Sequence, residues 1–393
     1  MRTPLHAEHE ALGATLTPFA GWDMPLRYTS ELAEHRAVRG AAGLFDLSHM
    51  GEIRVAGTAA GADLDRALVG SLTTLAVGRA RYTMICDEDG GVLDDLIVYR
   101  TGEEDFLVVA NASNHDVVLA ALTERCAPGS VHDESAATAL IAIQGPAAAA
   151  VVEDLVGGDA AVTGLRNYAA APATVAGVPG LAARTGYTGE DGFELFVPAA
   201  EAVTVWRAAL AAGSGRGLVP AGLAARDTLR LEAGMPLYGN ELDRSTTPYE
   251  AGLGRVVRLD KTDADGAPLE FVGRLPLSAR AGSQPARVLV GLRVSGRRPV
   301  RHGHEVLTPG GVRVGVVTSG APSPTLGHPV AMAYVTTEVS GVGTRLGVDV
   351  RGRVEAVEVV DLPFYRRSQD AASAGRQDGD PGTGAGAKTG GQS

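Results

Sequence analysis

The sequence predicts an α+β fold followed by a separate β domain. Strand and helix patterns alternate over the first part of the chain, but two of the strands are joined by a tight hairpin rather than by a crossover helix. After about residue 250, short β runs are separated by glycine and proline. The first pattern is typical of mixed α/β layers with antiparallel sheets, and the second of a small β-barrel or jelly-roll-like domain.

Helix and strand signals define the mixed layers. Residues 29–39 are expected to form a helix, because Ser30 can cap its amino end and Gly40 can terminate it. Further elements are predicted in chain order: a strand at 52–56, a helix at 63–69, a hairpin at 81–86 and 92–99, a strand at 106–110, a helix at 116–125, a strand at 138–143, and helices at 146–155 and 199–212. This order argues against a doubly wound parallel sheet.

The last third of the chain is predicted to be β-rich and to end in a tail. The expected strands are at 288–293, 312–318, 331–335 and 354–360. Residues 368–393 hold seven glycines and no large hydrophobic side chain. Such a segment cannot bury enough surface to offset its ordering entropy, so we expect the tail to be disordered.

The segment RTGYTGEDGFE, residues 184–194, is dense in glycine, aromatic and charged residues. Gly186, Gly189 and Gly192 permit positive φ and the close approach of a flat ligand, and Tyr187 offers a ring face. Glu194 begins a strand-like run, so its carboxylate can pair with adjacent N–H donors of a ligand. The alternative is a β-hairpin whose glycines serve only the turn.

The predicted hairpin carries a second candidate site at Asp94 and Asp95. Adjacent strand residues face opposite sides, and strict alternation places Asp95 on one face with Leu93 and Ile97. Burial among apolar neighbours would perturb the pKa of that carboxyl. The alternative is an edge strand on which both aspartates are solvated.

Composition excludes several classes of function. The chain has 393 residues, 45% of them hydrophobic, which is enough for two or three domains. A net charge of −11 argues against nucleic acid or an anionic membrane as the main partner, and no run is long and apolar enough to span a membrane. We therefore expect a cytoplasmic protein. Two cysteines without a Cys/His cluster, and an isolated His302/His304 pair, predict no metal site.

Six motifs in series carry a family resemblance. They are GWDMPL at 21–26, FDLSHMGE at 45–52, GGVLDD at 90–95, IQGP at 143–146, RTGYTGEDGFE at 184–194 and GLAARDTLRLE at 222–232. Together they closely resemble the T-protein family of the glycine cleavage system, whose members are aminomethyltransferases. The resemblance runs from Thr3 to about Arg366.

The resemblance implies three domains around a central cavity, the first interrupted in sequence by the second. The expected boundaries are 1–51 with 138–250 for a discontinuous folate-binding domain, 52–137 for an inserted α+β domain that carries Asp95, 251–367 for the C-terminal β domain, and 368–393 for the tail.

The resemblance also implies the reaction. Members of the family transfer the aminomethyl carbon from the lipoyl arm of H protein to tetrahydrofolate, their co-substrate, with release of ammonia and formation of 5,10-methylenetetrahydrofolate. By similarity, Asp95 lies close to the nucleophilic folate nitrogen, where it accepts a proton or stabilises a cationic species; sequence does not separate these roles. The residues expected to bind folate are Glu194, Tyr187, Tyr82, Arg226, Met50, Asn111, Tyr238 and Arg366.

For the arginines on the last motif an alternative stays open. Arg226 and Arg230 lie one helical turn apart and share a face of the expected helix. Either can bind folate, or be held in an ion pair with Asp227 or Glu232.

Other folate-dependent functions are weighed against this one. A related demethylase acting on a small methylated substrate would share the folate carboxylate and differ in the cavity. The folate-binding part of a sarcosine or dimethylglycine oxidase would need a flavin domain, for which this sequence has no dinucleotide fingerprint. A folate-binding module of iron–sulfur assembly would carry a cysteine motif that does not occur here.

Overall fold

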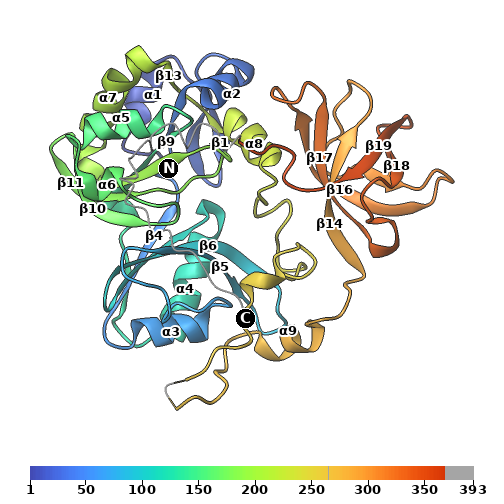
Figure 1. The fold of residues 1–393 in the computed structure, drawn as a ribbon, viewed down its shortest axis with the longest axis horizontal. Helices are drawn as coiled ribbons and strands as arrows, with labels where there is room; N and C mark the ends of the chain where they lie inside the picture. The colour runs from blue at the N-terminus through green and yellow to red at the C-terminus, as the bar shows by residue number, and fades with distance from the viewer. Residues whose placement is uncertain (264, 368–393) are drawn as a thin grey trace, which may run out of the picture.

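The computed structural model describes residues 1–263 and 265–367. They form two large sheets, a small hairpin sheet and a closed barrel, with helices packed on the sheets. In Figure 1 the first large sheet lies at the upper left, the second below it, and the barrel at the right, with helix α8 (Leu223–Glu232) between the first sheet and the barrel. The arrangement confirms the α+β fold with a C-terminal β-barrel. The predicted tail lies outside the described residues.

The first sheet has six strands in the order β10-β11-β12-β9-β3-β13. Their bounds are β3 Ala42–Asp46, β9 Thr138–Gln144, β10 Ala170–Val175, β11 Val178–Ala183, β12 Gly192–Pro198 and β13 Leu218–Pro220. All neighbours are antiparallel except β13, which runs parallel to β3. Helices α5 (Ala148–Leu155) and α7 (Ala202–Gly213) pack on this sheet and bury Val151 and Trp206 in its core.

Several smaller elements surround this sheet. They are α1 His6–Ala11, the hairpin β1 Thr15–Phe19 with β2 Trp22–Arg27, α2 Glu31–Gly40 and α6 Ala160–Thr163. The Ser30 hydroxyl accepts a hydrogen bond from the Ala33 N–H at 3.2 Å, which confirms the predicted cap of α2.

The second sheet has five antiparallel strands in the order β5-β6-β7-β4-β8. The bounds of these strands and of the sheet's two helices are β4 Gly51–Ala56, α3 Ala60–Ala67, β5 Ala80–Cys86, β6 Val92–Gly102, β7 Asp105–Ala110, α4 His115–Arg125 and β8 Val131–Asp133. All of these elements lie between β3 and β9 in the chain. A shared apolar cluster that includes Phe45, Tyr99, Leu140 and Phe196 joins the two sheets.

The last part of the chain forms the barrel, in the strand order β14-β17-β16-β15-β18-β19. Its bounds are β14 Arg287–Val294, β15 Glu305–Leu307, β16 Arg313–Pro322, β17 Pro329–Thr336, β18 Arg345–Asp349 and β19 Val354–Val360. Valines fill most of its interior. Before the barrel, α9 (Arg274–Arg280) places Leu277 against the turn of the β5–β6 hairpin at Gly90.

Some predicted elements are displaced or were missed. Helix α3 begins at Ala60, three residues before the predicted Asp63, whose carboxylate accepts from the Ala127 N–H at 2.9 Å. Strands β15 and β18 were not predicted, and β15 is only three residues long. Such short strands carry too few apolar positions to show a period.

A buried polar network joins α8 to the barrel. Glu232, at the end of α8, receives hydrogen bonds from Ser323 and from the Thr325 hydroxyl at 2.7 Å. The Arg39 guanidinium lies 2.9 Å from the same carboxylate, and His35 lies 3.2 Å from it. Burial opposes ionisation, but His35, Ser323 and Thr325 lower the pKa of Glu232 to about 2. The network fixes the carboxyl end of α8 against the loop between β16 and β17.

Candidate active site

Glu194 forms a buried acceptor site on β12. Its Oε2 atom accepts hydrogen bonds from the Tyr99 hydroxyl at 3.0 Å and from the Thr185 hydroxyl. Within the described residues, no hydrogen bond uses its other oxygen, Oε1. Burial raises the pKa of this carboxyl, while the two hydroxyls and the nearby Arg226 oppose that shift. The free oxygen can accept an N–H from a bound ligand.

Two cavities meet at Tyr187 and Arg226, which line both. The one that reaches Glu194 is a void of about 10 Å³, the size of one water molecule. The other holds about 440 Å³, within the range of small-molecule sites. Its walls come from β1, α8, the segment around Asn240, and barrel residues that include Arg301.

Arg226 and Arg230 project from α8 but have different partners. The Arg226 guanidinium lies 4.5 Å from the centre of the Tyr187 ring, and it forms no ion pair with any described residue. Arg230 is paired with Glu241 and Asp227, both at 2.8 Å. The ion-pair alternative therefore describes Arg230, while Arg226 keeps its charge available to the cavities.

Asp95 lies in a hydrogen-bonded group on β6. The Tyr82 hydroxyl donates to its Oδ2 at 3.0 Å, and the Asn111 side-chain amide donates to its Oδ1 at 2.9 Å. Burial raises the pKa of Asp95 to about 6, and the two hydrogen bonds and Arg226 limit the rise. Asp95 does not line either of the two cavities.

Asp94 is fully buried and holds the neighbouring turn. It accepts hydrogen bonds from the backbone N–H of Asn111 at 2.9 Å and from the side chain of Asn114 at 2.7 Å. The Asn111 amide also donates to Asp94 at 2.9 Å, so one side chain contacts both carboxylates. Burial, and then the charge of Asp95, raise the pKa of Asp94 to about 7.

The prediction of which side chains share a strand face with Asp95 was partly wrong. Leu93 packs in the apolar cluster with Leu96 and Val98, not on the face of Asp95 and Ile97. The reason is a β-bulge, because the register between β5 and β6 shifts between Ile85 and Cys86 and breaks the alternation at Leu93. Asp95 shares its face with Ile97 and Tyr99, toward the first sheet.

The glycines of the 184–194 segment serve the protein itself. Only Gly189 has a positive φ, of 80°. A Cβ at Gly186 or Gly192 would lie 1.9 or 2.3 Å from the Gln144 side chain, so these glycines make room for Gln144. That side chain donates to the Thr185 carbonyl at 3.0 Å and accepts from the Thr188 hydroxyl at 3.1 Å, which holds the segment beside Glu194.

Five of the eight expected folate residues lie outside the lining of both cavities: Tyr82 and Asn111, which contact Asp95, and Met50, Tyr238 and Arg366. Met50 packs against the cluster between the sheets, and the Tyr238 hydroxyl donates to the Val92 carbonyl at 3.2 Å. The exposed Arg366 side chain contacts the Leu362 carbonyl at 3.4 Å. Arg39 stacks on Tyr365 at 4.0 Å.

Sequence reasoning did not single out Tyr99, Thr185 or Gln144. Tyr99 could have been found, because it lies four residues after Asp95 on the same face of a predicted strand. Thr185 lies within the singled-out segment. Gln144 lies on another strand, and nothing in its local sequence indicates that its side chain fills the space left by two distant glycines.

Neither a metal cluster nor a membrane-spanning helix is found among the described residues. No group of three or more His, Cys, Asp or Glu residues there could hold a metal ion. His304 instead accepts the backbone N–H of Arg301 at 3.0 Å, and His302 contacts the Thr318 carbonyl at 2.8 Å. No helix of residues 1–263 and 265–367 is long and apolar enough to cross a bilayer.

Comparisons with known proteins agree over almost the whole chain. Residues 5–261 match the family model described as the GCVT N-terminal domain, and residues 287–366 match the glycine cleavage T-protein C-terminal barrel domain. An aminomethyltransferase of Saccharopolyspora erythraea is 59% identical over 369 residues, covering 93% of this chain and 98% of that protein. One from Streptomyces coelicolor is 59% identical over 374 residues, covering 94% and 98%. The crystal structure of glycine cleavage system aminomethyltransferase T from Bartonella henselae is 37% identical, covers 93% of this chain and 98% of that one, and superposes with a TM-score of 0.83.

Proposed function

Because the chain belongs to the glycine cleavage T-protein family of aminomethyltransferases, we propose that its substrates are tetrahydrofolate and the aminomethyl group on the lipoyl arm of an H protein. The products are ammonia and 5,10-methylenetetrahydrofolate. One observation of the structure carries the proposal: a buried carboxylate with one oxygen that no described residue contacts by a hydrogen bond, and an arginine that no described residue pairs, flank adjoining cavities.

The chemistry of these groups fits a folate. The pterin ring of tetrahydrofolate carries N–H donors along one edge, and Glu194 offers an acceptor that the described residues leave free. Tyr187 supplies an aromatic wall, and Arg226 can donate to an oxygen of the ligand. Because Tyr187 and Arg226 lie between the two cavities, these side chains must move apart for the ring to reach Glu194.

We assign the reaction itself to Asp95. Tyr82 and Asn111 hold its carboxylate, and Arg226 lies close enough to lower its pKa. In the ionised form Asp95 can accept a proton from the attacking folate nitrogen or stabilise a developing cation. Tyr82 and Asn111 thus act in our proposal by positioning Asp95.

The remaining assignments stay predictions. These are contacts of Tyr82, Asn111, Met50, Tyr238 and Arg366 with folate, the domain boundaries at residues 51, 137 and 250, and a cytoplasmic location.

The decisive experiment supplies purified H protein loaded with the aminomethyl group. Ammonia release that depends on tetrahydrofolate supports the proposal. Absence of release, or release that is independent of folate, contradicts it. Folate-dependent turnover of a small methylated compound without H protein would instead favour the demethylase alternative.

The pH dependence of turnover tests the ionisation of Asp95. Below its pKa of about 6 the carboxyl is protonated and can neither accept a proton nor stabilise a cation. We therefore expect turnover at saturating folate to fall as pH decreases through about 6. The same profile recorded with Asp95→Asn should lack this decrease; a decrease of the same size in the variant would assign it to another group.

Arg226→Gln is expected to weaken tetrahydrofolate binding by roughly tenfold or more, since a charge-assisted hydrogen bond contributes about 1.5–3 kcal/mol. Arg226 has no ion-pair partner among the described residues, so the melting temperature should change little. Fluorescence titration with folate measures the affinity. An unchanged dissociation constant would remove Arg226 from the site.

A further inference from the structure

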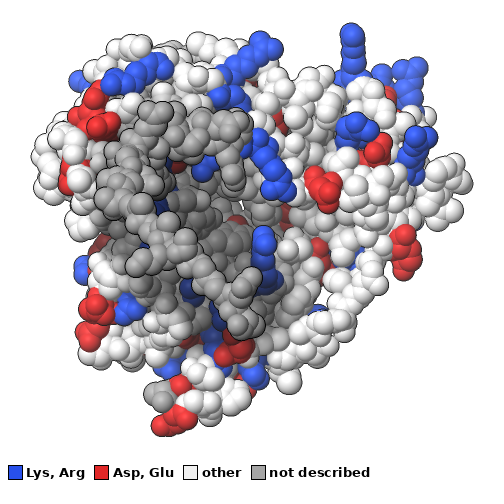
Figure 2. Space-filling model, in the orientation of Figure 1, with Lys and Arg blue, Asp and Glu red and all other residues white. Residues whose placement is uncertain are grey.

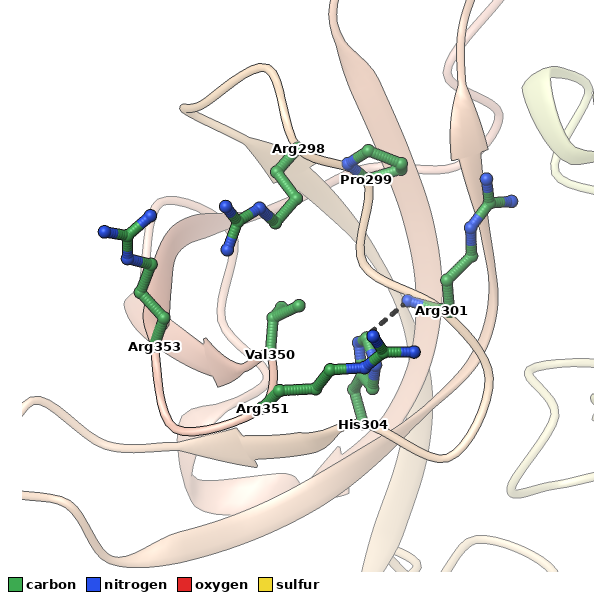
Figure 3. Close-up of a pocket in the computed structure, with 7 residues that line it drawn as sticks. All are labelled: Arg298, Pro299, Arg301, His304, Val350, Arg351 and Arg353. Carbon is green, nitrogen blue, oxygen red and sulfur yellow. Dashed lines mark hydrogen bonds between the residues drawn. The ribbon is translucent and has the colours of Figure 1, made fainter.

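A third cavity, with a basic lining, lies at one end of the barrel. It holds about 450 Å³ and is lined by Arg298, Pro299, Arg301, His304, Val350, Arg351 and Arg353, which we call the arginine pocket. Residues 298–304 come from the segment between β14 and β15, and residues 350–353 from the turn between β18 and β19. Figure 3 shows these side chains around an opening, and Figure 2 shows Lys and Arg side chains projecting from the barrel at the upper right.

The polar side chains that line the arginine pocket are almost all hydrogen-bond donors. Among the described residues, the sole ion pair of its arginines joins Arg298 to Glu355 at the long distance of 3.7 Å. Nδ1 of His304 accepts the Arg301 backbone N–H, so in the neutral ring Nε2 carries the proton and is a further donor. Three guanidinium groups with no carboxylate partner among the described residues, and a fourth with only the distant Glu355, form a local site for an anion with several negative groups in a chain of net charge −11.

Arg301 connects the arginine pocket to the candidate active site. It also lines the 440 Å³ cavity, together with Arg226 and Tyr187. In Figure 3 its side chain points away from the other arginines, toward the ribbon of the neighbouring part of the molecule. The Arg301 guanidinium donates to the Gly320 carbonyl at 3.1 Å, which holds it between the two openings.

We propose that the arginine pocket binds the γ-linked glutamate chain of polyglutamylated tetrahydrofolate, an inference that rests on the function proposed above. Glu194 holds the pterin end in that proposal, so the glutamate end of the ligand points toward the wider cavity and Arg301. Each added γ-linked glutamate brings one more carboxylate. A chain of them passes Arg301 and meets Arg298, Arg351 and Arg353.

This occupant has an advantage over free anions. The tail is covalently joined to a ligand that is already bound, so its carboxylates meet the arginines at a high effective concentration. An exposed carboxylate–guanidinium pair strengthens binding by roughly 1.4- to 5-fold. Several such pairs together give a preference for polyglutamate of about tenfold or more.

The test compares tetrahydrofolate monoglutamate and polyglutamate by equilibrium titration. The variant is Arg351→Gly combined with Arg353→Gln, because Arg351 has a φ of 57°, which glycine adopts more readily. The control is Arg345→Gln, which removes an exposed arginine of β18 outside the pocket lining. Wild type and control should bind polyglutamate about tenfold or more tightly, with a preference that shrinks as salt is raised. The double variant should lose most of this preference and keep its monoglutamate affinity within about twofold.

Each other outcome overturns the inference. No preference in wild type, or an undiminished preference in the double variant, places the tail elsewhere. An equal loss for both ligands means that the arginines act only through the general field of the barrel. A higher KM for loaded H protein with unchanged folate affinities makes the pocket a protein-docking surface. Monoglutamate that fails to bind wild type contradicts the proposed function instead, so the two failures are distinguishable.

Discussion

Replacing Asp95 by asparagine is expected to lower the turnover of aminomethyl transfer by about a hundredfold or more. The amide keeps the size of the side chain and can still accept from Tyr82, but it loses the negative charge and the capacity to take a proton. Folate affinity should change much less, because the interaction that is lost is made in the transition state. Ammonia release from loaded H protein under saturating tetrahydrofolate measures this effect.

Asp94→Asn is the matched control on the same strand. Both carboxylate oxygens of Asp94 accept hydrogen bonds from N–H groups of Asn111 and Asn114. An asparagine at this position would replace one of these acceptors with an NH₂ group that faces other N–H donors. We expect this variant to lower the melting temperature more than the turnover, since Asp94 is buried away from the cavities. If Asp94→Asn abolishes turnover and Asp95→Asn does not, the roles of the two faces are inverted. If both variants stay active, the carboxylate mechanism is wrong.

Glu194→Gln should raise the dissociation constant of tetrahydrofolate by about ten- to a hundredfold. The Tyr99 and Thr185 hydroxyls can still donate to the amide oxygen, but the amide nitrogen then faces the N–H edge of the pterin. The loss of a charge-assisted hydrogen bond costs roughly 1.5–3 kcal/mol, which corresponds to that range. Titration with tetrahydrofolate in the absence of H protein isolates the effect on binding.

Asp191→Asn provides the comparison for Glu194. Asp191 belongs to the same segment but is paired with Arg184 on the protein's own surface and lines neither cavity. Its loss should leave folate affinity within about threefold, because partly exposed ion pairs contribute little. A folate titration of Glu194→Gln that matches wild type would show that the pterin binds elsewhere.

Local signals were sufficient for the main features of the fold. Ser30 at a helix start and the turn at residues 87–91 are decided by neighbours in sequence, and both were predicted. The candidate pair Glu194 and Tyr187 was likewise visible, because glycines, a tyrosine and a carboxylate are crowded into one segment. In each case the residues that determine the feature lie within a few positions of one another in the sequence.

What could not be predicted depends on contacts between distant parts of the chain. The bulge at Leu93 places this side chain on the opposite face of the sheet from the one that strict alternation along an isolated strand would predict. From the sequence, Gly186 and Gly192 look like ligand contacts. In the structure, the side chain of Gln144 on β9 occupies the space beside both glycines. Arg226 and Arg230 look equivalent on a helix, but Arg230 is paired with Asp227 and with Glu241, which lies outside the helix.

Helix α8 bears on how this protein can be recombined with its relatives. Arg226 lies in its first half, while Glu232 at its far end is held by Ser323 and Thr325 of the barrel, and Arg230 by Ser319. The placement of Arg226 therefore depends in part on a segment nearly a hundred residues later in the chain. A chimera that exchanges the barrel alone would keep every cavity residue of α8 but could still change the position of the Arg226 side chain. Because Arg39 and His35 of α2 hold the same Glu232 carboxylate, α8 should stay with the first sheet, and the exchanged barrel should keep residues equivalent to Ser319, Ser323 and Thr325.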